Sequence, residues 1–217
     1  MNVYFISGLA ADERVFSHIL LPDGCQPVHL NWIPAQEKES LQGYASRLSQ
    51  KINASEPFAI IGLSMGGMVA TEIAKKFNPV ATILLSSVPS YRHFPLRIKV
   101  SGALRLNRLL PVSFFKKASL IKRFFITEAT ADKALLEQVI RDSDPVFISW
   151  ALGAILEWRN EALPENYFHI HGNRDEIFPM AKTKPTHIIK GGTHLMVLSK
   201  ANEINVILRE ILSSHIR

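Results

Sequence analysis

The sequence contains a single cysteine, Cys25, among 217 residues. One cysteine excludes an internal disulfide framework and a zinc site built from several cysteines. No apolar run reaches the length of a membrane span, and no basic stretch precedes the short apolar run at residues 3–6, as a secretory signal would require. From these absences we expect a cytoplasmic protein without stable membrane insertion.

Acidic residues are missing from one long stretch, residues 91–127, which is rich in arginine and lysine. Its basic residues are Arg92, Arg97, Lys99, Arg105, Arg108, Lys116, Lys117, Lys122 and Arg123. The formal net charge of +6 is a property of the whole chain and does not by itself indicate a nucleic-acid partner, which we do not expect. The stretch is interpreted first as a solvated basic face of helices, and a membrane-surface patch or attraction for an anionic substrate are the alternatives.

Short apolar runs alternate with helical patterns along most of the chain. The predicted strands cover residues 3–6, 27–32, 58–61, 80–85, 167–172 and 186–189, and helices are predicted at 40–51, 65–77 and 201–212. This alternation predicts βαβ units, a parallel sheet and helices on both faces of it. From about residue 90 to 162 strand patterns are absent, and helices are expected there, including about 131–141 and 146–158.

The most informative motif is Gly-Leu-Ser-Met-Gly-Gly at residues 62–67, between a predicted strand and a predicted helix. The chain must reverse sharply at Ser64, and Gly62 and Gly66 allow the strand and the helix to approach each other. Such a turn exposes the serine hydroxyl at the end of a sheet, beside free backbone N–H groups of a helix start. The alternative is a glycine-rich turn whose serine has no role.

A serine nucleophile needs a base, and parallel sheets form sites beyond the carboxyl ends of their strands. The last two predicted strands are followed by Asp175 and His194. The order Ser64, Asp175, His194 is the order expected for this kind of turn. We predict His194 as the general base and Asp175 as the group that orients it. Glu176 is the alternative acid, and Asp175 in a turn or His194 in a loop without a role are the plainer interpretations.

The developing negative charge on a carbonyl oxygen needs hydrogen-bond donors. The backbone N–H of Met65, which follows the nucleophile, is predicted as one donor. The second is predicted in the loop after the first strand, at Leu9, with Ala10 as the alternative.

The other histidines have less suitable positions. His169 and His171 lie within a predicted strand, where we expect them to pack or form hydrogen bonds. His93 lies in the helical stretch and could contact a substrate.

Four motifs together resemble the α/β-hydrolase fold superfamily. They are Val-Tyr-Phe-Ile-Ser-Gly-Leu at 3–9, the motif at 62–67, His-Gly-Asn-Arg-Asp-Glu-Ile-Phe-Pro at 171–179, and Gly-Gly-Thr-His at 191–194. The likeness spans essentially the whole chain, although Ser7 stands where the family usually has histidine. It implies one domain over residues 1–217 with a mostly parallel six-stranded sheet, a core at 1–90 and 163–217, and a helical cap at about 91–162, after the fourth strand.

The resemblance also implies a serine hydrolase that cleaves a small carboxylic ester through an acyl-enzyme, without a metal or organic cofactor. A thioesterase, an amidase, a carbon–carbon bond hydrolase or a lyase could use the same three residues. A non-catalytic small-molecule receptor could also retain them. A monomer or a homodimer is expected.

Overall fold

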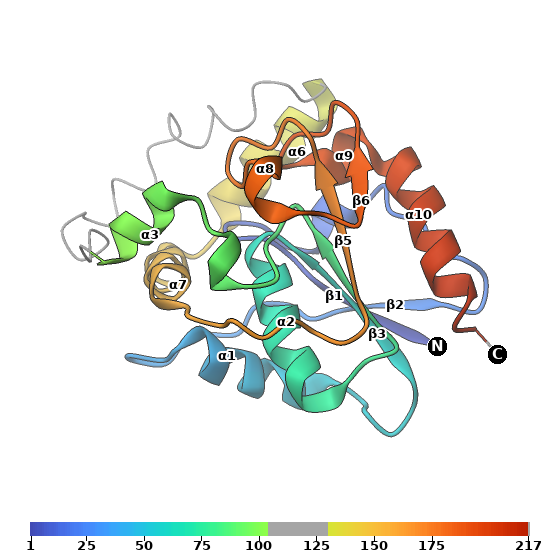
Figure 1. Cartoon of the computed structure of the whole chain (residues 1–217), viewed down its shortest axis with the longest axis horizontal. Coiled ribbons are helices and arrows are strands. Elements are labelled where there is room, and N and C mark those ends of the chain that lie inside the picture. The colour runs from blue at the N-terminus through green and yellow to red at the C-terminus, as the bar shows by residue number, and fades with distance from the viewer. Residues whose placement is uncertain (104–129, 217) are drawn as a thin grey trace.

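The computed structural model describes residues 1–103 and 130–216, which form a single six-stranded sheet with helices on both faces (Figure 1). The strand order is β2-β1-β3-β4-β5-β6 and every neighbouring pair is parallel. The strands are β1 (Asn2–Ile6), β2 (Gln26–His29), β3 (Phe58–Leu63), β4 (Ala81–Leu85), β5 (Tyr167–Gly172) and β6 (His187–Ile189). The predicted parallel sheet is therefore confirmed.

The strand order reverses direction at β1. The chain moves outward from β1 to β2 and then places β3 on the opposite side of β1. In open parallel sheets, such a reversal leaves a crevice beyond the carboxyl ends of the two strands. The loop after β1 and the turn after β3 meet at this point.

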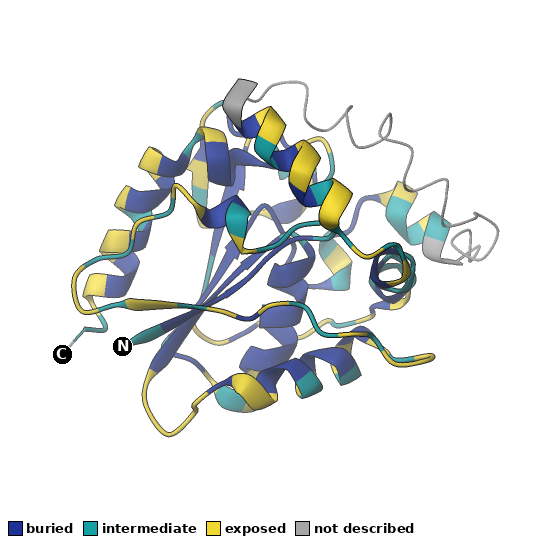
Figure 2. Ribbon diagram, turned by 180° about the vertical axis from the view of Figure 1, so that it is seen from behind, coloured by how far each residue is buried: buried dark blue, intermediate teal, exposed yellow. Residues whose placement is uncertain are grey.

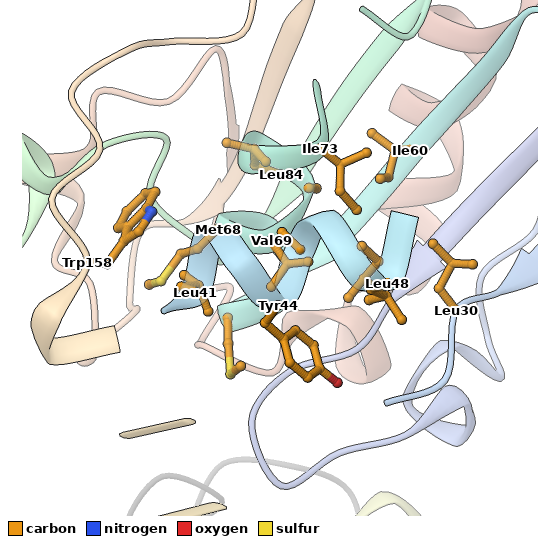
Figure 3. Close-up of a cluster of buried hydrophobic side chains, with 14 of the residues drawn as sticks. Leu30, Leu41, Tyr44, Leu48, Ile60, Met68, Val69, Ile73, Leu84 and Trp158 are labelled. Carbon is orange, nitrogen blue, oxygen red and sulfur yellow. The ribbon is translucent and has the colours of Figure 1, made fainter. Parts of the chain in front are cut away.

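One face of the sheet is covered by α1 (Leu41–Leu48) and α2 (Met65–Phe77). Figure 3 shows Tyr44 of α1 and Val69 of α2 in the same buried cluster as Ile60 of β3. Ser40 begins α1 by accepting a hydrogen bond from the Gly43 N–H at 3.1 Å. The helix predicted over residues 40–51 continues after Leu48 only as the 3₁₀ turn η2 (Ser49–Lys51).

The opposite face is covered by α9 (Met196–Ser199), α10 (Ala201–Ser213) and the 3₁₀ turn η1 (Glu13–Phe16). Ile204, Leu208 and Ile211 of α10 are buried on the side of the helix that faces the sheet. Ile61 of β3 points to this face, whereas its neighbour Ile60 points to the other. Both faces of β3 are thus buried, and Figure 2 shows the central strands in the colour of buried residues.

The described parts of the segment between β4 and β5 are helical, as expected. Its described elements are the 3₁₀ turn η3 (Tyr91–His93), α3 (Leu96–Ala103), α6 (Thr130–Asp142) and α7 (Pro145–Glu157). A short α8 (Met180–Thr183) lies between β5 and β6. The basic residues Arg105, Arg108, Lys116, Lys117, Lys122 and Arg123 lie outside the described residues. Within residues 1–103 and 130–216, no helix has the length and apolar character needed to cross a membrane.

Candidate active site

Ser64 occupies the turn between β3 and α2, with φ 52° and ψ −116°. A non-glycine residue in this conformation costs about 1–3 kcal/mol, so the surroundings must hold it. The Ser64 N–H donates to the Leu85 carbonyl at 2.9 Å, and the Ser64 carbonyl accepts from Ser87 Oγ at 2.6 Å. The half-buried side chain of Ser64 therefore projects from a fixed backbone.

Three glycines allow this turn to pack against neighbouring backbone. A Cβ on Gly62 would overlap the carbonyl oxygen of Gly66, and a Cβ on Gly66 would overlap the carbonyl oxygen of Ile6. A Cβ on Gly67 would meet the Ser87 hydroxyl. The glycine pattern of the motif is thus a requirement of close packing between β1, β3 and α2.

The three predicted residues lie together at the carboxyl ends of their strands. Ser64 Oγ is 2.9 Å from His194 Nε2, and His194 Nδ1 is 2.8 Å from Asp175 Oδ2. A carboxylate only accepts hydrogen bonds, so the proton of a neutral His194 lies on Nδ1 and leaves Nε2 to accept from the serine hydroxyl. The arrangement can remove a proton from Ser64.

Asp175 is buried, and its other oxygen is occupied as well. Oδ1 accepts hydrogen bonds from the backbone N–H groups of Ile177 at 2.8 Å and Phe178 at 2.9 Å. Burial alone would raise the pKa of Asp175, but the charge that His194 can carry and the hydrogen bond from it outweigh that effect and lower the pKa. Asp175 therefore remains a carboxylate beside the imidazole.

The loops that present Asp175 and His194 are bonded to each other. The Arg174 N–H donates to the Gly192 carbonyl at 2.9 Å, and the Gly191 N–H donates to Asn173 Oδ1 at 2.7 Å. A Cβ on Gly172 would overlap the Gly192 carbonyl oxygen, so the two loops pack backbone to backbone. This contact fixes the spacing of the acid and the base.

The two predicted oxyanion donors belong to the two segments that meet at the Ser64 turn. Met65 is the first residue of α2, and Leu9 lies in the loop after β1. Gly8 packs directly on the serine, since an ideal Cβ on Gly8 would be 3.5 Å from the Ser64 Cβ. In the part of the chain that the structure describes, neither the Leu9 N–H nor the Met65 N–H donates to another group of the protein.

Trp32 braces the loop that carries Leu9. Its indole Nε1–H donates to the Ala11 carbonyl at 3.0 Å and lies 3.3 Å from the Gly8 carbonyl. The Ser7 hydroxyl, at the position where the family usually has histidine, donates to the same Ala11 carbonyl at 2.8 Å. The sequence pattern does not predict these hydrogen bonds of Trp32, because it assigns Trp32 to a strand over residues 27–32. That strand ends at His29, and Trp32 turns away from the sheet edge toward the loop.

A cavity of about 240 Å³ opens beside this loop. Its apolar lining includes Ala10, Trp32, Ile33 and Phe147. Its polar lining includes the carboxylates Asp12, Asp142 and Asp144. Arg14 neutralises part of this charge through ion pairs with Asp12 at 2.6 Å and Asp142 at 2.8 Å.

Arg97 of α3 reaches the loop that carries Asp175. Its guanidinium Nη2 donates to the Ile177 carbonyl at 3.0 Å and to the Glu176 carbonyl. A short sequence pattern does not predict this contact, because Arg97 and Ile177 are 80 positions apart.

The structure also places the competing residues. Glu176 contributes its backbone carbonyl to the bond with Arg97, whereas the carboxylate that bonds His194 belongs to Asp175. His93 Nδ1 lies 2.8 Å from the Ser90 hydroxyl. His169 and His171 are buried in β5 and are bonded to each other.

The model of the Alpha/beta hydrolase family matches residues 5–205 of the chain. The chain belongs to the α/β hydrolase family. Membership of this family supports a hydrolase role for the chain. No curated protein sequence matches it.

Several solved structures have the same fold as this α/β hydrolase. MenH from S. aureus has a TM-score of 0.74 at 16% identity, over 99% of this chain and 94% of that one. The enol-lactonase from Burkholderia xenovorans LB400 has a TM-score of 0.76 at 12% identity, over 98% and 91%. A thermophilic esterase from Thermogutta terrifontis has a TM-score of 0.70 at 17% identity, over 100% and 91%. At these identities the likeness shows the fold alone.

Proposed function

We propose that the protein is a serine hydrolase that cleaves a small carboxylic ester through an acyl-enzyme on Ser64. The observation that carries this proposal is the continuous contact from Ser64 Oγ through the His194 imidazole to the Asp175 carboxylate, at 2.9 and 2.8 Å. The names of two proteins with this fold, an esterase and an enol-lactonase, also describe the cleavage of ester bonds.

In the first half-reaction, Ser64 Oγ attacks the ester carbonyl carbon while His194 Nε2 accepts the serine proton. The negative charge on the carbonyl oxygen is bound by the N–H groups of Leu9 and Met65, and each such donor is typically worth about 2.7–4 kcal/mol of barrier. The tetrahedral intermediate then expels the alcohol, which takes the proton from His194. The acyl group remains bound to Ser64 Oγ as an ester.

In the second half-reaction, water attacks the acyl carbon and His194 removes a proton from it. Collapse of this second intermediate releases the carboxylic acid and returns the proton to Ser64. Throughout, Asp175 holds the His194 tautomer and stabilises the imidazolium that forms twice in each cycle. The reaction as written needs no cofactor.

The cavity beside the loop that carries Leu9 is lined by Ala10 and Ala11 but not by Ser64 or His194, so in this proposal it holds only a small, neutral part of the substrate away from the reacting carbonyl. Its volume of about 240 Å³ lies just below the usual range for a ligand pocket of about 300–1,000 Å³. Trp32 and Phe147 provide apolar walls, whereas three carboxylates with one arginine as counter-ion disfavour an anionic group there. The alternative interpretation of the basic stretch, attraction for an anionic substrate, depends mainly on basic residues outside the described part of the chain.

In this proposal, residues 91–162 act as a cap over the carboxyl ends of the strands. Support comes from Arg97 of α3, which bonds the loop of the catalytic acid, and from Phe147 of α7, which lines the cavity. Trp150 of α7 also donates to the Glu39 carbonyl at 2.9 Å, just before α1. A cap attached at these points would limit the access of water and of large substrates.

Labelling with a fluorophosphonate tests the nucleophile. We expect the wild type to be labelled on the peptide that contains Ser64, because the probe reacts with a serine whose proton is removed by a neighbouring base. Ser64→Ala should not be labelled. Ser55→Ala is the matched control, since Ser55 is an exposed loop serine before the start of β3, and it should be labelled like the wild type.

Labelling of Ser64→Ala would assign the reactive nucleophile to another residue, and no labelling of the wild type would favour a non-catalytic receptor. Either result would overturn Ser64 as the nucleophile. If Ser64 is labelled, a panel of esters, thioesters and amides with the same acyl group identifies the bond that is cleaved. Faster turnover of the thioester or the amide would replace the ester assignment while leaving the acyl-enzyme intact.

A further inference from the structure

Two histidines of β5, His169 and His171, take no part in the proposed reaction and are wholly buried. They are two positions apart, so their side chains leave the strand on the same face. Their ring centroids are 4.9 Å apart, and His169 Nε2 lies 3.1 Å from His171 Nδ1. Burying two imidazoles is costly unless their polar atoms are paired, so their arrangement calls for a physical explanation.

The hydrogen bonds of this pair have a defined direction. His171 Nε2 lies 2.7 Å from the carbonyl oxygen of Phe178, which can only accept, so His171 carries its proton on Nε2. Nδ1 of a neutral His171 is then an acceptor, and His169 must donate to it from Nε2. The bonds therefore run from His169 to His171 to Phe178, toward the loop of the catalytic acid.

Phe178 connects this pair to the catalytic residues. Its backbone N–H donates to Asp175 Oδ1 at 2.9 Å, and its ring centroid lies 5.6 Å from that of His194. His171 Nε2 is also only 3.4 Å from Asp175 Oδ2, the oxygen that accepts from His194 Nδ1. One residue, held by the His171 N–H, thus contacts both the acid and the base.

We propose that His171 is a positioning residue of the active site, whose Nε2–H anchors the Phe178 carbonyl and thereby holds Asp175 in place. His169 acts indirectly, because its hydrogen bond to His171 Nδ1 orients the His171 ring. This inference rests on the proposed function, because it assigns the pair a role in holding the acid and the base of that reaction.

The pair is suited to this role because it stays neutral. Burial lowers the pKa of His171, and although the Asp175 charge opposes this effect, the pKa remains below the ordinary value. Burial, and then the neighbouring His171, lower the pKa of His169 to about 3. The titratable groups that face the pair are Asp175 and His194 beside His171 and His93 beside His169. Because both pKa values lie below the ordinary value of about 6.5, both imidazoles are expected to be neutral at about pH 7 and above.

The test compares His171→Gln with His171→Met. The two side chains have nearly the same length, but only glutamine has an N–H to donate to Phe178 and an oxygen to accept from His169. We expect kcat of His171→Met to fall on the order of 10- to 100-fold, because a small displacement of catalytic groups has effects of this size. KM should change little, since His171 is buried behind the acid loop, and His171→Gln should recover most of kcat.

Proton NMR gives an independent readout. The signal of the His194 Nδ1–H, bonded to Asp175, should be present in the wild type and in His171→Gln and broadened or displaced in His171→Met. If both variants have kcat values within twofold of the wild type, or fall equally with unchanged NMR signals, His171 only fills space and the inference is wrong.

Two further measurements keep the test decisive. If His171→Met does not fold, His169→Met and His169→Gln provide the same comparison one bond further from the acid, with a smaller loss of kcat expected in the methionine variant alone. Equal kcat values of these two variants would count against the inference.

The rate of fluorophosphonate labelling separates the two hypotheses. A wild type that is not labelled refutes the proposed function. A wild type that is labelled, together with a His171→Met variant that is labelled at the same rate, refutes only the role of His171.

Discussion

At the scale of single residues, the site depends on a strained serine and on glycines beside it. A side chain at these glycines would displace the neighbouring backbone. Ser64 is held at a positive φ, and Gly66 lies where a Cβ would overlap the Ile6 and Ser7 carbonyl oxygens. The sequence motif predicts the sharp turn and the need for small residues beside it. It does not predict that Gly66 packs against β1, the strand that leads into the loop with Leu9.

Gly66→Ala should damage both stability and activity. The added methyl group must displace backbone of β1 or α2, and we expect a loss of about 1–3 kcal/mol or more in the free energy of unfolding. Gly43→Ala is the matched control, because a Cβ there would lie at an ordinary 3.5 Å from the Ser40 hydroxyl, within helix α1. Alanine should stabilise that helix by up to about 1 kcal/mol.

Urea unfolding and the rate of ester hydrolysis measure both glycine variants. A Gly66→Ala protein as stable and as active as the wild type would show that the turn tolerates a side chain.

At the scale of elements, three loops form the site and each is held by contacts from outside it. The loops after β5 and β6 bond to each other, and the loop after β1 is braced by Trp32. Periodicity in the sequence predicts the strands and helices that precede these loops to within a few residues. It places Trp32 in a strand, because a short apolar run does not reveal that its indole N–H bonds a loop about 21 positions away.

Trp32→Phe tests this brace, because it removes the indole N–H but keeps an aromatic ring against the cavity. We expect kcat for a short-chain ester to fall about 10-fold, less than the 10²–10³-fold effect of deleting an oxyanion donor, since the Leu9 N–H is displaced rather than removed. Trp150→Phe is the matched control: its indole N–H bonds the Glu39 carbonyl in the segment before α1. Equal kcat values for the two variants would contradict a brace at Trp32.

At the scale of the whole molecule, the parallel sheet explains why distant residues meet. Ser64 and His194 are 130 positions apart, yet both follow carboxyl ends of strands in one sheet. A site containing both could be predicted from the sequence because a parallel sheet places the loops after all its strands at one edge, although β3 and β6 are not neighbours in the sheet. The contact of Arg97 with the acid loop depends on how the helical segment packs on the core. No local pattern in the sequence carries that information.

The buried histidine pair should make stability depend on pH. The folded state keeps His169 and His171 neutral, with a pKa of about 3 for His169, whereas the unfolded chain protonates histidines below about pH 6.5. The pair therefore does not reduce the free energy of unfolding above about pH 6.5. Below that pH, the free energy of unfolding falls as the pH decreases toward the folded pKa values. Each such group can contribute up to about 1.4 kcal/mol per pH unit in this window.

Urea unfolding at about pH 7.5 and about pH 5 measures this dependence. His169→Gln removes one of the two groups and should reduce the difference in unfolding free energy between the two pH values. If the difference is the same in this variant as in the wild type, the folded protein does not hold His169 neutral.

In the proposed reaction, Ser64 carries the acyl group during turnover. Rapid acid quenching during hydrolysis of an activated acetate ester, followed by mass spectrometry of the peptides, tests it directly. We expect an acetyl group on Ser64 in the wild type, and in Ser64→Ala no acetylated peptide and an activity reduced by orders of magnitude. An acetyl group on a different residue, or full activity of Ser64→Ala, would contradict it.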